Sequence, residues 1–218
     1  MAAMDTLGLQ EIPPAMKLAA SSATGQDRRF FHALFLLDAR LDRAVREASE
    51  PIIAQLKLAW WRDRFAERPE NWPKGEPLLE ELANWGGEAA GLGALVDGWE
   101  VLATGQSLSA SDIESFVGGR SAAWLALARV LQPDIDDELA RRVDDAARFF
   151  ALADLKERGV QVPDASSPVP GTLPRLPRRL RPFSVLAALG QRALRKDRPI
   201  LDGFPALALA MRHGLVGR

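Results

Sequence analysis

The spacing of apolar residues is the feature that most constrains how this chain can fold. From Asp27 to Ala48, apolar side chains recur every three or four residues, at Phe30, Leu34, Leu37, Leu41 and Val45. This spacing places them along one face of an α-helix. Strand signals are weak, because the chain has no tyrosine, few runs of Val, Ile and Thr, and no strict alternation. The sequence therefore predicts an all-α fold.

A second helix is expected directly after the first, from Pro51 to about Glu67. Proline suits the first helical position, where its missing N–H would have no partner in any case. The link is so short that the two helices should pack as neighbours and form one wall of a central cleft. Further helices are expected at 78–84, 94–103, 111–131, 135–157 and 183–196, with a short final helix after them.

Two segments depart from plain helical patterns. Gly118 and Gly119 stand inside a predicted helix, which indicates a kink, a close helix contact or a ligand near the backbone. Residues 159–182 are rich in proline and are expected to form an extended surface segment. The arginines of that segment are either solvated or in contact with acidic lipid headgroups or a protein partner: Arg175, Arg178, Arg179 and Arg181.

Composition limits the classes of function. The 218 residues, 47% of them hydrophobic, suit a single domain spanning 1–218. Basic residues number 28 and acidic residues 29, so no general attraction for nucleic acid is expected. The absence of cysteine excludes disulfides and thiolate metal sites. The N-terminus lacks a signal-peptide pattern, and no apolar run reaches a membrane span. A cytoplasmic protein is expected, at most peripheral to the inner face of a membrane.

Acidic and basic residues step along the first predicted helix at intervals of four, as Asp38, Asp42 and Arg46. One interpretation is an ordinary surface pair, since an acid four residues before a base stabilises a helix. The other is a metal site, because two carboxylates at this spacing share one helical face and Mg²⁺ prefers oxygen ligands. The spacing alone leaves both open.

Longer phrases of the sequence resemble a known family. The stretches "ALFLLDARLDRAV" and "SEPIIAQLKLAWWRD" are similar to the opening of the squalene/phytoene synthase family. They are closest to its divergent branches, which include relatives that serve as respiratory complex I assembly factors. "GGRSAAWLALARVL", "DDAARFFALADLKERGVQVP" and "LPRRLRPFSVLAAL" match more loosely. The resemblance implies a trimmed, single-domain helical bundle of the isoprenoid synthase type. In the family, two aspartate-rich segments on facing helices bind magnesium and hold two prenyl diphosphates.

The resemblance places Asp42 at the first aspartate of the family's first motif, and Arg46 where a second carboxylate is expected. In the second motif, Lys156 and Glu157 occupy the basic and acidic places, and a later carboxylate is missing. Exchanging a carboxylate for arginine changes the local charge by two units, each of roughly 4 kcal/mol at about 4 Å. A magnesium cluster should therefore assemble poorly beside Arg46.

The expected function is a non-catalytic, squalene/phytoene synthase-like protein that binds a prenyl diphosphate or lipid-like ligand or acts like an assembly factor. Asp42 and Glu157 are the catalytic candidates, and Asp42 and Asp38 the metal candidates. The residues expected to contact ligand are Arg46, Arg62, Lys156 and Trp60. Two alternatives stay open: an active magnesium-dependent head-to-head prenyl diphosphate synthase, and an interaction protein whose cavity is filled by its own side chains.

Overall fold

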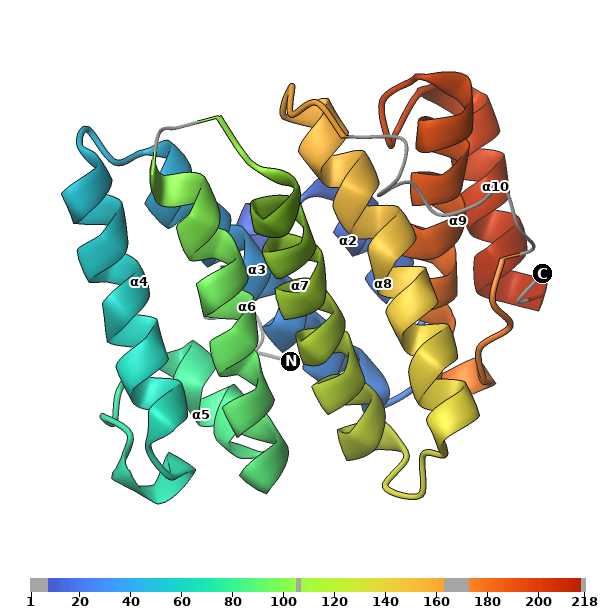
Figure 1. The fold of residues 1–218 in the computed structure, drawn as a ribbon. Coiled ribbons are helices and arrows are strands. Elements are labelled where there is room, and N and C mark those ends of the chain that lie inside the picture. Colours follow the sequence, from blue (N-terminus) through green and yellow to red (C-terminus); the bar gives the residue numbers. More distant parts are fainter. Residues whose placement is uncertain (1–7, 105–106, 163–172, 217–218) are drawn as a thin grey trace.

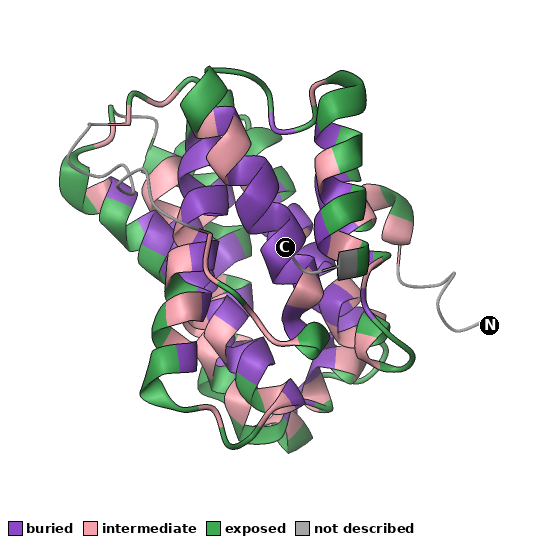
Figure 2. Ribbon diagram, turned by 90° about the vertical axis from the view of Figure 1, so that its right-hand side faces the viewer, coloured by how far each residue is buried: buried purple, intermediate pink, exposed green. Residues whose placement is uncertain are grey.

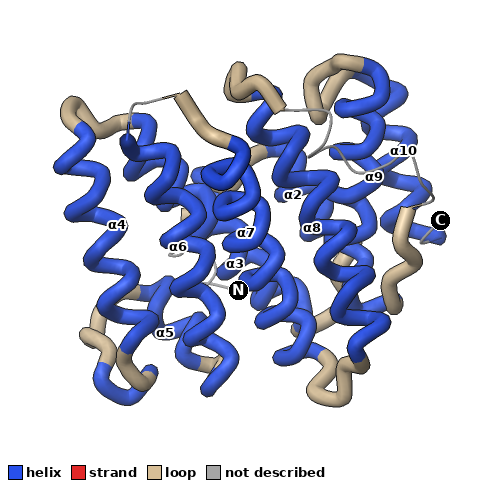
Figure 3. The backbone as a smooth tube through the Cα atoms, in the orientation of Figure 1, coloured by secondary structure: helices blue, strands red, loops and turns tan. Residues whose placement is uncertain are grey.

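The computed structural model describes residues 8–104, 107–162 and 173–216 (Figure 1). Within these ranges the chain is helical and has no strand, as Figure 3 shows, which confirms the predicted all-α class. None of the described helices has both the length and the apolar character needed to cross a bilayer. The α-helices are α2 (Pro14–Ala20), α3 (Asp27–Arg46), α4 (Pro51–Ala66), α5 (Pro77–Ala83), α6 (Leu92–Glu100), α7 (Ala110–Leu131), α8 (Asp137–Glu157), α9 (Arg181–Lys196) and α10 (Gly203–Val216).

The helices form two layers. In Figure 1, α4, α6, α7, α8, α9 and α10 stand side by side in one row, and α2, α3 and α5 lie behind it. Within the row, the closest packing joins α6 to α7, α7 to α8 and α8 to α9. Helix α3 contacts α4, α5, α6 and α7, and α2 contacts α3 and α9. The space between α2, α3 and the middle of the row is where the candidate site lies.

The predicted apolar face of α3 is buried as expected. Leu34, Leu37 and Leu41 are buried, and Phe30 and Val45 at the two ends are partly buried against the same core. Figure 2 shows the buried residues gathered along the inner faces of the helices. The core is continued by Phe183, whose ring stacks on Trp124 at 4.1 Å between centroids. Burial of this apolar surface holds the two layers together.

Helix α4 begins at Pro51, as predicted, with proline in its first turn. Its position differs from the expectation, because it packs mainly on α6 and contacts α3 less. The expectation that the first two predicted helices form one wall of a cleft holds only for α3, because no residue of α4 lines the central pocket. Short helix α2, which the sequence analysis did not predict, takes part in that wall instead.

The prediction that residues 159–182 form an extended segment is wrong for the last five residues of that range. A 3₁₀ turn covers Arg178–Leu180, and α9 begins at Arg181 with Pro182 in its first turn. Proline is compatible with a first turn because no intrahelical bond needs its N–H there. Residues 163–172 of the segment lie outside the described residues.

The glycine pair of α7 is explained by a close helix contact. A Cβ on Gly119 would collide with the Ala94 carbonyl oxygen of α6, whereas a Cβ on Gly118 would meet nothing within 4 Å. Of this pair, Gly119 is therefore the glycine that permits the close approach of α6 to α7. Trp99 of α6 lies near the next residue, Arg120, with its ring centroid 5.7 Å from the guanidinium.

Candidate functional site

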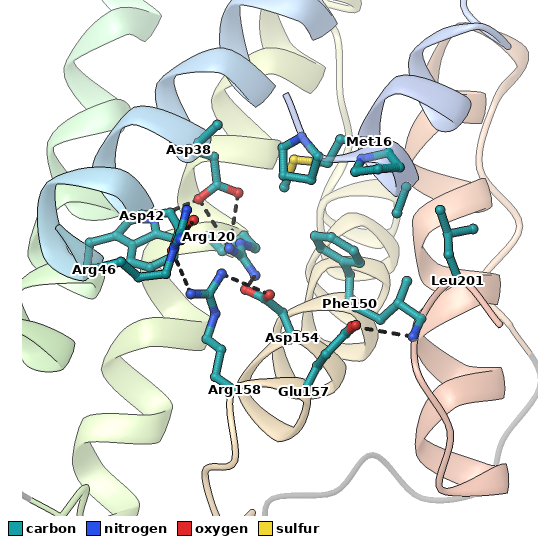
Figure 4. A pocket seen from close by; sticks show the side chains of 16 residues that line it. Met16, Asp38, Asp42, Arg46, Arg120, Phe150, Asp154, Glu157, Arg158 and Leu201 are labelled. Carbon is teal, nitrogen blue, oxygen red and sulfur yellow. Dashed lines mark hydrogen bonds and ion pairs between the residues drawn. The ribbon is translucent and has the colours of Figure 1, made fainter. Parts of the chain in front are cut away.

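A pocket of about 380 Å³ opens between the two layers. Figure 4 shows that residues of α3, α7 and α8 bring charged side chains to one side, while Met16, Phe150 and Leu201 lie on the other. Its apolar residues are Pro13, Pro14, Ala15, Met16, Ala39, Trp99, Phe150, Ile200 and Leu201, and its charged residues are Asp38, Asp42, Arg46, Arg120, Asp154, Glu157 and Arg158. The pocket therefore has an apolar half and an ionic half.

Asp38 is buried in the ionic half, 3% exposed. It accepts hydrogen bonds from Trp99 Nε1 at 2.7 Å and from Arg120 Nη2 at 3.1 Å. Burial raises the pKa of Asp38 above its ordinary value, although the positive charge of Arg120 acts in the opposite direction. Asp38 is thus fully engaged with protein donors, in keeping with a structural role.

Asp154 of α8 faces Asp38 across Arg120. It accepts from Arg120 Nη1 at 2.9 Å and from Arg158 Nη2 at 3.1 Å. Burial alone would raise the pKa of Asp154, but the two guanidinium groups outweigh burial and lower it. Asp154 is therefore ionised and shared between two arginines.

Asp42 lies nearer the mouth of the pocket, with its side chain 12% exposed. It accepts from Arg158 Nη1 at 2.6 Å and from Arg46 Nε at 2.9 and 3.0 Å. Burial disfavours the charge on Arg158, but Asp154 and Asp42 outweigh burial and raise the pKa of Arg158. Asp42 therefore binds both the arginine that follows it on α3 and one that reaches it from the C-terminal cap of α8.

Arg120 is held from all sides at 1% exposure. Besides its two carboxylates, its guanidinium lies 4.7 Å from the ring centroid of Phe116 and 5.2 Å from that of Phe150. Such cation–π contacts gain strength when the cation is desolvated. The Nε of Arg120 has no hydrogen-bond partner among the described residues.

Together these contacts form a continuous ionic network in the order Asp38, Arg120, Asp154, Arg158, Asp42 and Arg46. Each carboxylate of the network touches at least one guanidinium. Among the described residues, no group of three or more acidic or histidine side chains is arranged to hold a metal ion. Glu157 stands apart from the network and accepts from the backbone N–H of Ile200 at 3.4 Å.

The predicted site residues divide into two groups. Asp38, Asp42, Arg46 and Glu157 line the same pocket, so the structure brings these four together. The other three are elsewhere: Arg62 pairs with Asp97 and Glu100, Lys156 pairs with Asp197 at 2.8 Å, and Trp60 lies on the outer face of α4.

The sequence analysis missed Trp99, Arg120, Asp154 and Arg158. Asp154 and Arg158 carry a readable signal, because they are four residues apart on one helical face, as Asp42 and Arg46 are. Arg120 carries another, since it follows Gly118 and Gly119 in a stretch of small residues where a helix is expected to be buried. A buried arginine needs acidic partners, and those partners come from α3 and α8.

An interaction protein with a filled cavity would have Trp60, Phe149 and Phe150 plugging the cleft, but these side chains leave this pocket open. Phe150 contributes to its wall, Trp60 is 40% exposed on α4, and Phe149 is buried without lining the pocket. The pocket therefore remains open to solvent.

The arginines expected at the surface are partly used within the protein. Arg179 pairs with Asp27 at 2.7 Å, and Arg181 donates to the Gly214 carbonyl oxygen at 3.4 Å. Arg175 and Arg178 are exposed. Among the described residues, two of these four arginines therefore make contacts within the protein.

Comparison with known proteins gives no match. No protein-family model matches the chain, and neither curated proteins nor solved structures provide a relative. The resemblance to squalene/phytoene synthases therefore stays a prediction.

Proposed function

We propose that the chain is a squalene/phytoene synthase-like protein of the trimmed isoprenoid synthase type that binds a prenyl or lipid-like ligand without condensing it. One observation carries this proposal: Asp38, Asp42 and Asp154 are each bonded to an arginine of the same chain. Magnesium would have to take its oxygen ligands from these pairs. Breaking a buried ion pair costs about 3–5 kcal/mol, so the arginines compete directly with a metal cluster.

The apolar half of the pocket supports a ligand with a hydrocarbon part. Met16, Phe150 and Leu201 face the space opposite the ionic network (Figure 4). Small-molecule sites are typically apolar clefts of roughly 300–1,000 Å³, and this pocket of about 380 Å³ lies in that range. An apolar tail would therefore be desolvated here.

The mouth of the pocket supports an anionic head on the same ligand. Arg46 uses its Nε for Asp42 and is 60% exposed, so its guanidinium also remains in contact with solvent. Arg158 is the second guanidinium near the mouth, with a side chain 26% exposed. Guanidinium groups bind diphosphate and carboxylate through paired hydrogen bonds. The proposed ligand therefore has an apolar tail and a phosphate or carboxylate head.

We also propose that the chain binds a protein partner, because the family it resembles includes assembly-factor-like members. The outer face of α4 supports it, because four large apolar side chains are exposed there: Ile52, Ile53, Leu56 and Trp60. Exposed apolar groups of this kind are typical of interaction surfaces.

A second candidate is an active magnesium-dependent prenyl diphosphate synthase. The observation in its favour is that Asp38 and Asp42 of α3 and Asp154 and Glu157 of α8 line one pocket from facing helices. In this candidate, the arginines would release the carboxylates when metal and substrate arrive together. The two candidates differ in whether product forms.

Calorimetric titration with farnesyl diphosphate, farnesol and geranylgeranyl diphosphate tests the proposal. We expect the wild type to bind at least one of them and Leu201→Trp, at the lip of the pocket, to bind at least about tenfold more weakly. Leu56→Trp, an exposed position on α4, is the matched control and should bind like the wild type. No binding, or equal binding by Leu201→Trp, would refute the pocket as the site.

Product analysis of the same mixtures with magnesium separates the two candidates. The binding protein should leave the diphosphates unchanged over many hours. Formation of a squalene- or phytoene-type hydrocarbon by the purified chain would establish the synthase instead.

A further inference from the structure

Helices α9 and α10 stand at the opposite end of the row from α4 (Figure 1). A second groove is lined by residues of these two helices. Its volume is about 600 Å³. Among the described residues, its lining includes no acidic residue but four cationic side chains and one histidine: Arg192, Arg195, Lys196, Arg212 and His213. The groove therefore has a strong excess of positive charge.

Arg192 forms the floor of this groove, with its side chain only 10% exposed. Its Nη2 donates to the Asp202 carbonyl oxygen at 3.3 Å. Its Nε and Nη1 are buried and have no acceptor among the described residues. Buried donors are almost always paired in folded proteins, so these two unpaired nitrogens indicate an acceptor from beyond the described residues, such as a bound anion.

His213 adds a second unpaired group beside the first. It is 5% exposed, and its Nε2 is buried without a partner among the described residues. Burial, helped by the nearby charge of Arg212, lowers the pKa of His213. An anion in the groove would offset both effects.

The neighbouring acids do not neutralise the rim of the groove. Asp197 pairs with Lys156 at 2.8 Å, and Asp202 lies within 3.3 Å of Arg198 and 3.6 Å of Arg192. Arg195, Lys196 and Arg212 are exposed, so these long side chains can rotate to admit a ligand. Their mutual repulsion decreases when a multivalent anion binds between them.

We propose that the groove between α9 and α10 is a binding site for a phosphate group. Phosphate offers several acceptor oxygens and more than one negative charge, which suits a cluster of guanidinium and ammonium groups. The site shares no lining residue with the central pocket, so the proposal does not depend on the function proposed for that pocket.

The outer face of α10 favours a lipid headgroup as the source of the phosphate. Four large apolar residues, spaced three or four apart, are 41–79% exposed and form what we call the α10 ridge: Phe204, Leu207, Met211 and Leu215. Arg212 links the α10 ridge to the groove, since it is exposed and also lines the groove. An apolar helical face flanked by basic residues is typical of helices that lie on a lipid surface.

Calorimetric titration with pyrophosphate tests the site in its soluble form. The double variant Arg195→Gln/Arg212→Gln removes two exposed cations without opening the core, and Arg192→Gln removes the floor. We expect each to weaken pyrophosphate binding at least about tenfold. The control Lys57→Gln/Arg68→Gln removes the same charge from exposed positions on and just after α4 and should bind like the wild type.

Co-sedimentation with vesicles distinguishes the two sources of phosphate. We expect the wild type to sediment with phosphatidylcholine vesicles that contain phosphatidylglycerol, and Phe204→Ser/Met211→Ser to lose this binding while keeping pyrophosphate affinity. Pyrophosphate binding without vesicle binding would assign the site to a free phosphate compound. Binding of neither ligand, or an equal loss in the Lys57→Gln/Arg68→Gln control, would overturn the proposal.

Discussion

The central pocket and the α9–α10 groove each contain a buried arginine, but the two arginines differ in how many carboxylates of the chain contact them. Arg120 in the pocket is flanked by two carboxylates and by aromatic rings. Arg192 in the groove touches only Asp202 and leaves Nε and Nη1 unpaired within the described chain. Among the described residues, Arg120 thus has two carboxylates, whereas Arg192 has one at 3.6 Å in a groove lined by further cations, which leaves positive charge for a ligand.

An arginine whose donors are paired within the chain contributes mainly to stability, whereas an arginine with unpaired donors is available to bind a ligand. Removing an ion from water costs free energy. A partner of opposite charge within the chain offsets that cost whether or not ligand is present. For Arg192, which has one carboxylate at 3.6 Å and two unpaired donors among the described residues, binding of an anion would offset more of that cost. The same substitution in the two sites should therefore have opposite consequences, for stability in one case and for affinity in the other.

The largest effect is expected from Arg120→Met. Removing this guanidinium leaves Asp38 and Asp154 facing each other without their shared partner, and such a loss typically costs about 3–5 kcal/mol. Urea denaturation followed by circular dichroism measures the change. The control is Arg141→Met. The side chain of Arg141 is 61% exposed and pairs with Glu138 at the surface, so this change should alter stability by less than about 1 kcal/mol. Near-equal stability of both variants would show that the pocket network is not structural.

The same variant makes a prediction about pH. Because the pKa of Asp154 lies below its ordinary value of 3.8, the native state gains stability above that pH and loses it as the pH falls. Asp38 has a raised pKa and acts in the reverse sense, and removing Arg120 would raise it further. The stability gap between wild type and Arg120→Met should therefore narrow as the pH is lowered from 7 toward 3. A gap that widens in acid would contradict the assigned charges.

A smaller effect is expected from the glycines that position Arg120. Gly119→Ala should cost about 1–3 kcal/mol, because the new methyl group collides with the backbone of α6. Gly118→Ala meets open space and should be neutral or stabilise by up to about 1 kcal/mol. Thermal denaturation of this matched pair measures both. Neither change should alter pyrophosphate binding, since α7 does not line the groove.

The smallest effect on stability is expected from Arg192→Met. This change removes two unpaired buried nitrogens at the expense of the contact with Asp202, so stability should stay within about 1 kcal/mol of the wild type. Affinity for pyrophosphate should decrease sharply in the same protein. If Arg192→Met lost as much stability as Arg120→Met, the proposed difference between the two arginines would be contradicted.

Much of the helical framework was predictable because it follows from local patterns. The apolar spacing of α3 and the proline at the start of α4 each act within a few residues, and both predictions match the structure. The proline-rich composition predicts a later start for α9 than the structure shows, because proline disrupts a helix interior, whereas Pro182 occupies a first turn. Helix α2 is a single short element whose role depends on packing against α9 and α3, which no local pattern reveals.

The site was only half predictable for a related reason. Asp42 and Arg46 form a local pair that the sequence displays, and they do lie together. The partner of Asp42 from α8, Arg158, is 116 residues away in sequence. The resemblance indicates Lys156 and not Arg158, because the register of α8 against the pocket depends on how α8 packs on α7 and α9. The direction in which each side chain of α8 points is therefore set by tertiary packing and not by the local sequence.

Magnesium dependence of ligand binding tests the central claim, that arginines of the chain itself occupy the pocket carboxylates. The measurement is a calorimetric titration with farnesyl thiodiphosphate, an unreactive analogue, in EDTA and in magnesium, with farnesol as the control for effects unrelated to the diphosphate. The account predicts binding in EDTA that magnesium strengthens no more than about threefold, well under the 1.4 kcal/mol that corresponds to tenfold. Binding that occurs only with magnesium would contradict it.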